Sequence, residues 1–189
     1  LLAPPGEHGV KWLGTLARVP ISGGPPRPLL DSVLDADWSP DGRNLAAIRW
    51  TGGAYQLEYP LGNVLWRPCP DTRLRVSPDG RRVAVLDTSR VVIVERTGER
   101  RSLATPPLHQ RLAWAPDGSA LLLDTGDSDL RRTLRRLSLD GSIAELAAQP
   151  GTLVVHDVSS DGRVLVHHGF ERWVVRARAP GESDEHDAS

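Results

Sequence analysis

The chain has 189 residues, with 23 Lys and Arg against 24 Asp and Glu, and a formal net charge of -1. This balance excludes the strongly cationic surface that charge-driven binding of nucleic acid requires. It also excludes a polyanionic disordered tail as the main content. The apolar runs are short, as in Val91–Val94, whereas a bilayer-spanning helix needs about 20 apolar residues. The sequence has no Met and one cysteine, Cys69, so we expect a processed or partial chain without an internal disulfide.

In chain order, the first element is the outer half of a repeat unit, in 13–31. A strand candidate covers 13–20, and the pair Gly23-Gly24 marks the turn that follows it. Four fuller units come next, each beginning with a short strand that ends in an apolar residue and a turn. These starts are Leu34–Gly42, Leu74–Gly80, Leu112–Gly118 and His156–Gly162. Self-similarity with a period near 40 residues is typical of propellers and solenoids.

The turn itself reads Ser or Ala, Pro, Asp, Gly in three units, and Ser160 replaces the proline in the fourth. Proline presets φ at the second position, aspartate hydrogen-bonds the turn backbone, and glycine accepts the last position. The Asp-Gly pairs are Asp41-Gly42, Asp79-Gly80, Asp117-Gly118 and Asp161-Gly162. Because all four aspartates share one position, we interpret them as structural turn residues and not as ligands.

An apolar strand follows each turn, and a second hairpin closes each unit. The apolar strands cover 45–48, 83–86, 121–123 and 164–166. Continuous apolar runs indicate strands covered on both faces. The second hairpins turn at Gly62, Gly98, Gly141 and Gly181, after strand candidates in 55–59, 91–96, 133–139 and 173–178. The run 130–137 has the spacing of one helix turn, but its position between strands favours a strand.

These units predict an all-β chain, a β-propeller of four-stranded antiparallel blades in 1–189 with about 4.5 blades present. The expected segments are a half blade in 13–31, blades in 32–67, 68–105 and 106–150, and a blade with a weak last strand in 151–189. A blade cannot bury both faces alone, so neighbours must stack. We therefore expect the missing blades to come from the same or another chain.

The repeated Ser-Pro-Asp-Gly turn after an apolar or Trp residue resembles the TolB-type propeller repeat, which is similar to WD40 repeats. Three segments, Gly14–Gly24, Asp35–Gly42 and Leu57–Leu65, resemble the propeller region of bacterial serine/threonine protein kinases. One departure is the short connection between Asp87 and Val91, where those relatives carry a longer loop.

This resemblance implies a non-catalytic sensory or interaction domain on the extracytoplasmic side of a bacterial membrane. The alternatives are an accessory propeller of a peptidase or hydrolase, and a free-standing TolB-like envelope protein. The chain carries no kinase motif, Walker loop, His-Glu-x-x-His or Gly-x-Ser-x-Gly. We therefore expect no catalytic residue, cofactor or metal here, and a protein or small molecule as the partner, with no nucleic acid and no membrane contact.

Several polar residues are weaker candidates for chemistry. Asp124, Asp127 and Asp129 form a carboxylate cluster that could offer oxygen ligands to Ca²⁺, although a solvated connection is the simpler interpretation. His156 shares its repeat position with apolar residues, so we expect it to be buried. His167 and His168 are adjacent in a strand and point to opposite faces, which argues against a metal pair.

The starts of the units also carry charges at equivalent positions. Adjacent blades would place Asp35 and Asp37 beside Arg73 and Arg75, and we expect ion pairs there that fix the register between blades. A second interpretation makes these residues the charged rim of a ligand-binding channel. Trp38 and Trp114 occupy equivalent positions and are expected in the core; exposed tryptophans elsewhere would indicate an interaction patch. The basic cluster, Arg131, Arg132, Arg135 and Arg136, is expected on a solvated strand.

Overall fold

The computed structural model describes residues 13–69, 72–87, 90–104, 111–128, 131–169, 176–177 and 186–187. Every regular element in these ranges is a β-strand, so the all-β prediction is confirmed. Accordingly, no helix in the described ranges has the length and apolar character needed to cross a membrane. Asp129, Gly181 and, apart from 176–177, the strand candidate 173–178 lie outside the described residues.

The first two sheets are formed by consecutive antiparallel strands. The first sheet has the order β1-β2-β3-β4-β5, with bounds Gly14–Arg18, Arg27–Trp38, Leu45–Thr51, Ala54–Glu58 and Val64–Trp66. The second has the order β6-β7-β8-β9, with bounds Thr72–Val76, Arg82–Asp87, Arg90–Glu95 and Arg100–Ala104. Each strand pairs with its neighbour in the sequence, which is the meander expected of a propeller blade.

The remaining strands continue this pattern. The third sheet has the order β10-β11-β12-β13, with bounds Leu112–Trp114, Ala120–Ser128, Arg131–Ser138 and Ile143–Pro150. β14 (Thr152–Val158) pairs with β15 (Val164–Gly169), and β16 (Arg176–Ala177) pairs with β17 (His186–Asp187). The run 130–137, which has the spacing of a helix turn, falls largely in strand β12, as the sequence analysis predicted.

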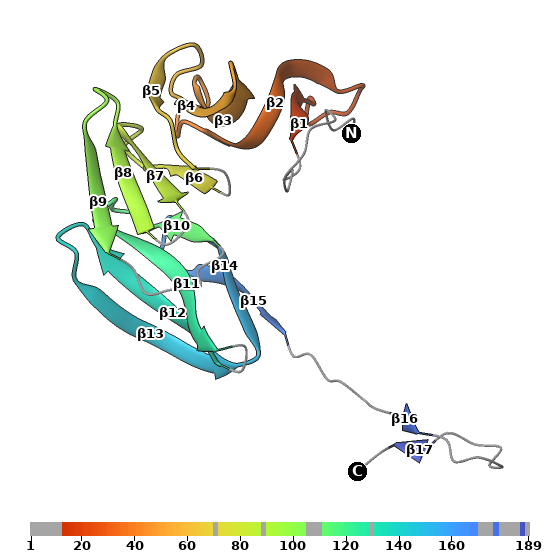
Figure 1. The fold of residues 1–189 in the computed structure, drawn as a ribbon, viewed down its shortest axis with the longest axis vertical. Helices are drawn as coiled ribbons and strands as arrows, with labels where there is room; N and C mark the ends of the chain where they lie inside the picture. Colours follow the sequence, from red (N-terminus) through yellow and green to blue (C-terminus); the bar gives the residue numbers. More distant parts are fainter. Residues whose placement is uncertain are drawn as a thin grey trace.

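The sheets follow one another in an open arc, from β1–β5 through β6–β9 and β10–β13 to β14–β15 (Figure 1). The strands that begin the repeat units lie on the inner side, where β2 packs on β6, β6 on β10, and β10 on β14. Within the described ranges, β14 has no matching contact with β2, so the arc does not close. A β-propeller with an open side is the fold that results.

The hydrophobic core consists of three clusters, each shared by two neighbouring sheets. The second sheet shows why continuous apolar strands are needed. Val83 and Val85 of β7 belong to the cluster with the first sheet, whereas Ala84 and Leu86 belong to the cluster with the third. Alternate residues of one strand thus face opposite neighbours, because side chains along a strand point to alternate faces.

The fourth apolar strand differs from the other three. The continuous apolar run predicted that 164–166 is covered on both faces, yet Leu165 is 63% exposed and Val166 38% exposed. The covering surface is missing because β15 pairs only with β14 in its sheet and no further sheet packs on its outer side within the described residues. The expectation was therefore wrong for this strand, although the strand itself forms.

Strand β2 joins two parts of the arc. Its first half, from Arg27, pairs with β1, and its second half, to Trp38, pairs with β3. Ser32 lies between the halves with φ of 58°, a left-handed conformation that is uncommon for a residue other than glycine. The strand turns at this residue from the outer hairpin β1–β2 into an innermost strand that faces the centre of the arc.

Candidate functional site

The four Asp-Gly turns hold the inner hairpins in the same way. In each, the glycine N–H donates to the carbonyl three residues earlier, as from Gly42 to Ser39 and from Gly80 to Ser77. Gly42, Gly80 and Gly118 have φ of 67°, 68° and 67°, values that only glycine adopts without strain. The carboxylates of Asp41, Asp79 and Asp117 each accept the backbone N–H two residues later.

These hydrogen bonds also change the acidity of the turn aspartates. The Ser39 hydroxyl, and then the Arg43 N–H, lower the pKa of Asp41. For Asp79, desolvation acts in the opposite direction, but the bonds from Ser77 and Arg81 outweigh it and the pKa is lowered. Hydrogen bonds to the charged form favour ionisation. Each of these carboxylates therefore accepts hydrogen bonds from its own turn, which supports a structural role.

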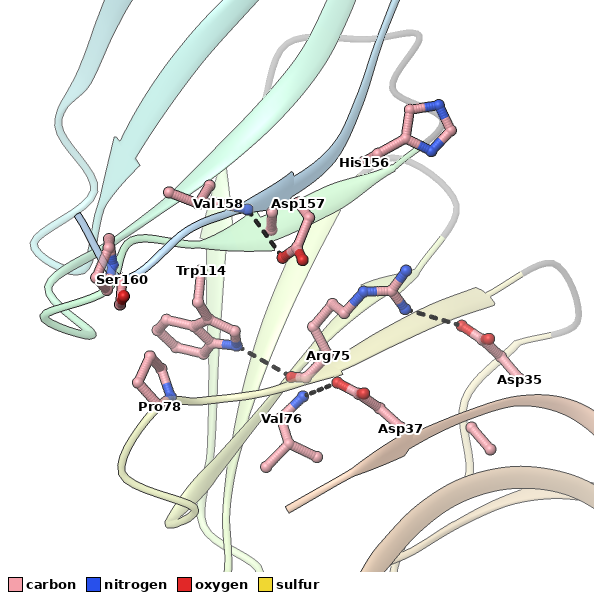
Figure 2. Close-up of a pocket in the computed structure, with 13 residues that line it drawn as sticks. Asp35, Asp37, Arg75, Val76, Pro78, Trp114, His156, Asp157, Val158 and Ser160 are labelled. Carbon is pink, nitrogen blue, oxygen red and sulfur yellow. Dashed lines mark hydrogen bonds and ion pairs between the residues drawn. The ribbon is translucent and has the colours of Figure 1, made fainter. Parts of the chain in front are cut away.

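The innermost strands line an open cavity of about 580 Å³, which we call the central cavity. Figure 2 shows side chains from all four inner strands around it, including Asp37 of β2, Arg75 of β6, Trp114 of β10 and Asp157 of β14. The full lining is Asp35, Ala36, Asp37, Arg75, Val76, Pro78, Ala113, Trp114, Pro116, His156, Asp157, Val158 and Ser160. Three carboxylates but one guanidinium line it, so the cavity attracts positive charge.

The predicted meeting of Asp35 and Asp37 with the next unit is present, but the contacts differ from those expected. Asp35 lies 3.9 Å from the Arg75 guanidinium, which confirms one ion pair. Its carboxylate also accepts the backbone N–H of Leu74 at 2.9 Å. Asp37 does not take an arginine; it accepts the N–H of Val76, also at 2.9 Å, and that of Trp38. Arg73 instead donates to the carbonyl of Thr72.

The role of Asp37 is therefore to bridge two inner strands through backbone groups. Burial raises the pKa of its carboxyl, because desolvation penalises the charged form more than the Val76 and Trp38 N–H groups and the Arg75 charge favour it. The repeat spacing predicted the correct pair of blades. It does not predict that the partners of Asp37 are backbone N–H groups.

The two equivalent tryptophans have different environments. Trp114 is 7% exposed, and its indole N–H donates to the carbonyl of Arg75 on the preceding unit at 3.0 Å. The Arg82 guanidinium lies over the Trp114 ring, 5.2 Å from the centroid, and pairs with Asp79. Trp38 is 46% exposed, so the expectation of a core position was wrong for it. No inner hairpin precedes β2 within the described residues to cover it.

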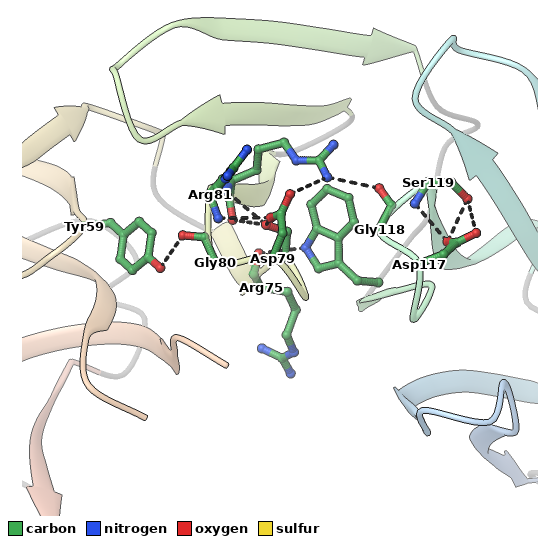
Figure 3. A network of polar contacts seen from close by, with 11 residues as sticks. Tyr59, Arg75, Asp79, Gly80, Arg81, Asp117, Gly118 and Ser119 are labelled. Carbon is green, nitrogen blue, oxygen red and sulfur yellow. Dashed lines mark hydrogen bonds and ion pairs between the residues drawn. The ribbon is translucent and has the colours of Figure 1, made fainter. Parts of the chain in front are cut away.

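Side chains also join the turns of neighbouring units, as Figure 3 shows around Asp79 and Gly118. Arg82 donates to the carbonyl of Gly118 at 3.3 Å, and the Tyr59 hydroxyl donates to the carbonyl of Gly80 at 2.7 Å. The second and third turns thus each accept a side chain from the preceding unit. These polar links hold the second sheet against the first and the third.

His156 is exposed at the rim of the central cavity, which contradicts the expectation that it is buried. The fourth turn is one residue shorter than the second, since Ser159 N–H bonds to the Arg163 carbonyl, whereas Ser77 N–H bonds to that of Arg82. A bulge at His156 restores the register: Val155 pairs with Val166 and Asp157 with Leu165. The extra residue turns out of the ladder. Counting the residues between the turn glycine and the apolar strand in each unit would have revealed the shorter fourth turn.

The remaining candidates do not form a site. The Asp124 carboxylate accepts the N–H of Arg111 at 2.9 Å, and the side chain of Asp127 lies outside the described part. Within the described ranges, no group of three or more His, Cys, Asp or Glu side chains is arranged to hold a metal ion. The ring centroids of His156 and His167 are 6.4 Å apart, and His168 contacts the Pro150 carbonyl.

The residues of the basic cluster lie on β12, which confirms the strand, but Arg132, Arg135 and Arg136 are half-buried and not fully solvated as expected. Arg136 donates to the hydroxyls of Ser119 and Ser138, which ties this strand to the neighbouring turn. Trp50 is 41% exposed and packs edge-on against Tyr55, with ring centroids 5.0 Å apart. Neither feature lines the central cavity.

Comparisons with known proteins place this fold. No protein-family model matches the sequence, and no curated protein matches it either. Among solved structures, TolB from Acinetobacter baumannii superposes with a TM-score of 0.68 at 17% identity, over 92% of this chain and 45% of that one. A protein assigned as TolB from Agrobacterium tumefaciens gives 0.68 at 18%, over 86% and 66%. Hydrazine synthase from Kuenenia stuttgartiensis gives 0.56 at 17%, over 82% and 49%.

The chain has the fold of a TolB-type β-propeller. The chain spans between about half and two thirds of the length of the two TolB structures. At these identities the similarity concerns the fold, so function must be argued from the central cavity and the surfaces of this chain.

Proposed function

We propose that this chain is a non-catalytic binding module, and that its ligand site is the central cavity. The observation that carries the proposal is the convergence of four inner strands on one cavity with an excess of carboxylates, Asp35, Asp37 and Asp157, over the single Arg75. Asp35 is neutralised in part by Arg75, whereas Asp157 is exposed and bonds only its own strand, to the N–H of Val158, among the described contacts. The ligand is a polypeptide segment or small molecule with positive charge.

The role we propose for the cavity is to bind a charged ligand and not to catalyse a reaction. Its rim combines the Asp157 carboxylate and the His156 imidazole with apolar surface from Pro78, Pro116 and Trp114. A few polar groups that converge in a concave and partly apolar site are the usual features of ligand recognition. The carboxylates attract a cationic group, and the aromatic and proline surfaces contact the adjoining chain.

Fluorescence polarisation with a labelled tri-arginine peptide and a labelled tri-glutamate peptide tests this site. We expect the tri-arginine peptide to bind and the tri-glutamate peptide not to bind. Asp157→Asn should weaken binding roughly three- to tenfold, the effect of one charge in a partly exposed site, and added salt should reduce it. Asp140→Asn is the matched control, because Asp140 is an exposed turn carboxylate that does not line the cavity. Equal binding of both peptides would contradict the proposal.

At the level of the whole protein, we propose the propeller as the sensory or interaction domain of a bacterial serine/threonine protein kinase-like protein, on the extracytoplasmic side of the membrane. Support comes from the resemblance of Gly14–Gly24, Asp35–Gly42 and Leu57–Leu65 to kinase-attached propellers. These segments form β1 with its turn, the inner strand with its turn, and the β4–β5 hairpin. A kinase domain encoded upstream in the same reading frame is the expected result of sequencing the flanking DNA.

A free-standing TolB-like protein is the second candidate, favoured by the TM-score of 0.68 with two TolB structures. In that case the flanking DNA encodes a signal peptide and no kinase. A downstream domain with Gly-x-Ser-x-Gly would instead identify an accessory propeller of a hydrolase and contradict both proposals.

A further inference from the structure

The two ends of the arc carry complementary halves of one interface. At one end, Trp38 is 46% exposed, and β1 is an edge strand of the first sheet. At the other end, β15 is an edge strand among the strands that the structure describes, with Leu165 and Val166 exposed. Exposed edge strands with apolar side chains are templates for pairing with another chain. Whether the two ends fit together depends on the side chains and backbone carbonyls that each end presents.

The contact between the second and third sheets shows how such ends fit. There, the indole N–H of Trp114 donates to the carbonyl of Arg75 on the preceding inner strand. The guanidinium of Arg82, at the end of the preceding turn, covers the indole ring. A cation over the face of a tryptophan adds to the attraction. A Trp in one unit therefore requires two groups of the unit before it: a carbonyl and an arginine.

Arg163 at the β14–β15 end is the counterpart of Arg82. The N–H groups of both arginines donate to the hydroxyl of the serine that opens their turn, each at 3.0 Å. Both guanidinium groups pair with the turn aspartate, Arg82 with Asp79 at 3.1 Å and Arg163 with Asp161 at 2.9 Å. The Arg163 side chain is 83% exposed and covers no described tryptophan ring. Asp157, which holds the position of Arg75, supplies the carbonyl.

The strands at the two ends are complementary as well. β14 and β15 correspond to the inner pair of a four-stranded blade, whereas β1 and the first half of β2 correspond to the outer pair. In the complete sheets, the second strand pairs antiparallel with the third, as β7 does with β8. β15 of one molecule can therefore pair with β1 of another and complete a blade, and this brings Trp38 of the second molecule next to Arg163 of the first.

We propose that two copies of this chain associate head to tail, with the β14–β15 hairpin of each copy and the β1–β2 hairpin of the other forming a shared blade. In each interface the Trp38 indole lies under the Arg163 guanidinium and donates to the Asp157 carbonyl. Two such interfaces, related by a two-fold axis, close the ring and complete the wall of the central cavity. A head-to-tail contact that closes in this way limits the assembly to a defined number of copies.

Sedimentation velocity on the 189-residue chain, at roughly 1 to 200 μM, tests the association in the range where weak dimers form. We expect a dimer, and we expect Trp38→Ala and Arg163→Ala each to raise its dissociation constant at least about tenfold, as for central interface residues. Both side chains are exposed, so the variants should fold. Trp50→Ala and Arg101→Ala remove an exposed tryptophan of β3 and an exposed arginine of β9, away from the Trp38 turn and from β14–β15, and should dimerise like the parent.

Mixing the two interface variants distinguishes a head-to-tail contact from other dimers. A dimer of Trp38→Ala with Arg163→Ala keeps one interface intact, because the intact Arg163 of one copy meets the intact Trp38 of the other. The mixture should therefore associate more strongly than either variant alone. A parent chain that stays monomeric throughout the range would overturn the proposal, as would single variants that dimerise like the parent or a mixture without recovery. A monomer would leave these ends to other segments of a longer polypeptide.

Discussion

A single carboxylate, that of Asp37, connects two blades through their backbones. One oxygen accepts the N–H of Trp38 and the other accepts that of Val76. A buried N–H that loses its acceptor costs the desolvation of that group, so the contact matters more than a surface ion pair. The neighbouring unit that Asp37 contacts could be predicted correctly, because the repeat register fixes which blades meet. The acceptor role could not be predicted, since every residue carries an N–H and composition does not distinguish among them.

We predict that Asp37→Asn lowers the free energy of unfolding by about 1–3 kcal/mol. The amide has one oxygen, so one of the two N–H groups would face the NH₂ group without an acceptor. Burial already raises the pKa of Asp37, so part of the loss is offset by removing a desolvated charge. Urea unfolding of dilute, monomeric protein measures the change. Asp157→Asn is the control, because its remaining oxygen still accepts the Val158 N–H; an equal loss in both variants would contradict the bridge.

At the scale of strands and hairpins, the repeat predicted the elements well and the register of the last unit poorly. The turns and apolar runs of β3, β7, β11 and β15 could be predicted because Pro-Asp-Gly turns and continuous apolar strands have direct local causes. The fourth unit fails because its turn lacks one residue before Val164, and the bulge at His156 compensates. A one-residue slip exchanges the faces of a strand, so a single missing residue decided that His156 is exposed.

Within the third sheet, burial predicts a sharp contrast between two leucines. Leu121 of β11 is 0% exposed in the cluster shared with the second sheet, and Leu146 of β13 is 49% exposed. We expect Leu121→Ala to lower the free energy of unfolding by about 2–5 kcal/mol, because it removes buried methyl groups and leaves a cavity. Leu146→Ala should change it by less than about 0.5 kcal/mol. Denaturant unfolding of both variants measures this, and similar losses would show that the strands are not packed as described.

Across the whole molecule, the three core clusters connect only neighbouring sheets, so stability should vary along the arc. The second sheet contributes to two clusters, whereas β14–β15 contributes to one and leaves β15 partly exposed. In such repeat arrays, stability is approximately the sum of unit terms and nearest-neighbour interfaces. The units at the ends, with one neighbour each, should open more readily than the units between them.

Native-state hydrogen exchange measures this gradient. In dilute protein, we predict that amides of β7 and β8 exchange only through global unfolding, because both faces of these strands are buried. Amides of β15 that point away from β14 should exchange much faster than those of β7 and β8, since their edge has no partner strand within the described residues. Substituting Leu121 should speed exchange in the second and third sheets more than in the first, whose cluster excludes it. Uniform protection across all sheets would instead require a core that couples the whole arc, and the three separate clusters give no route for such coupling.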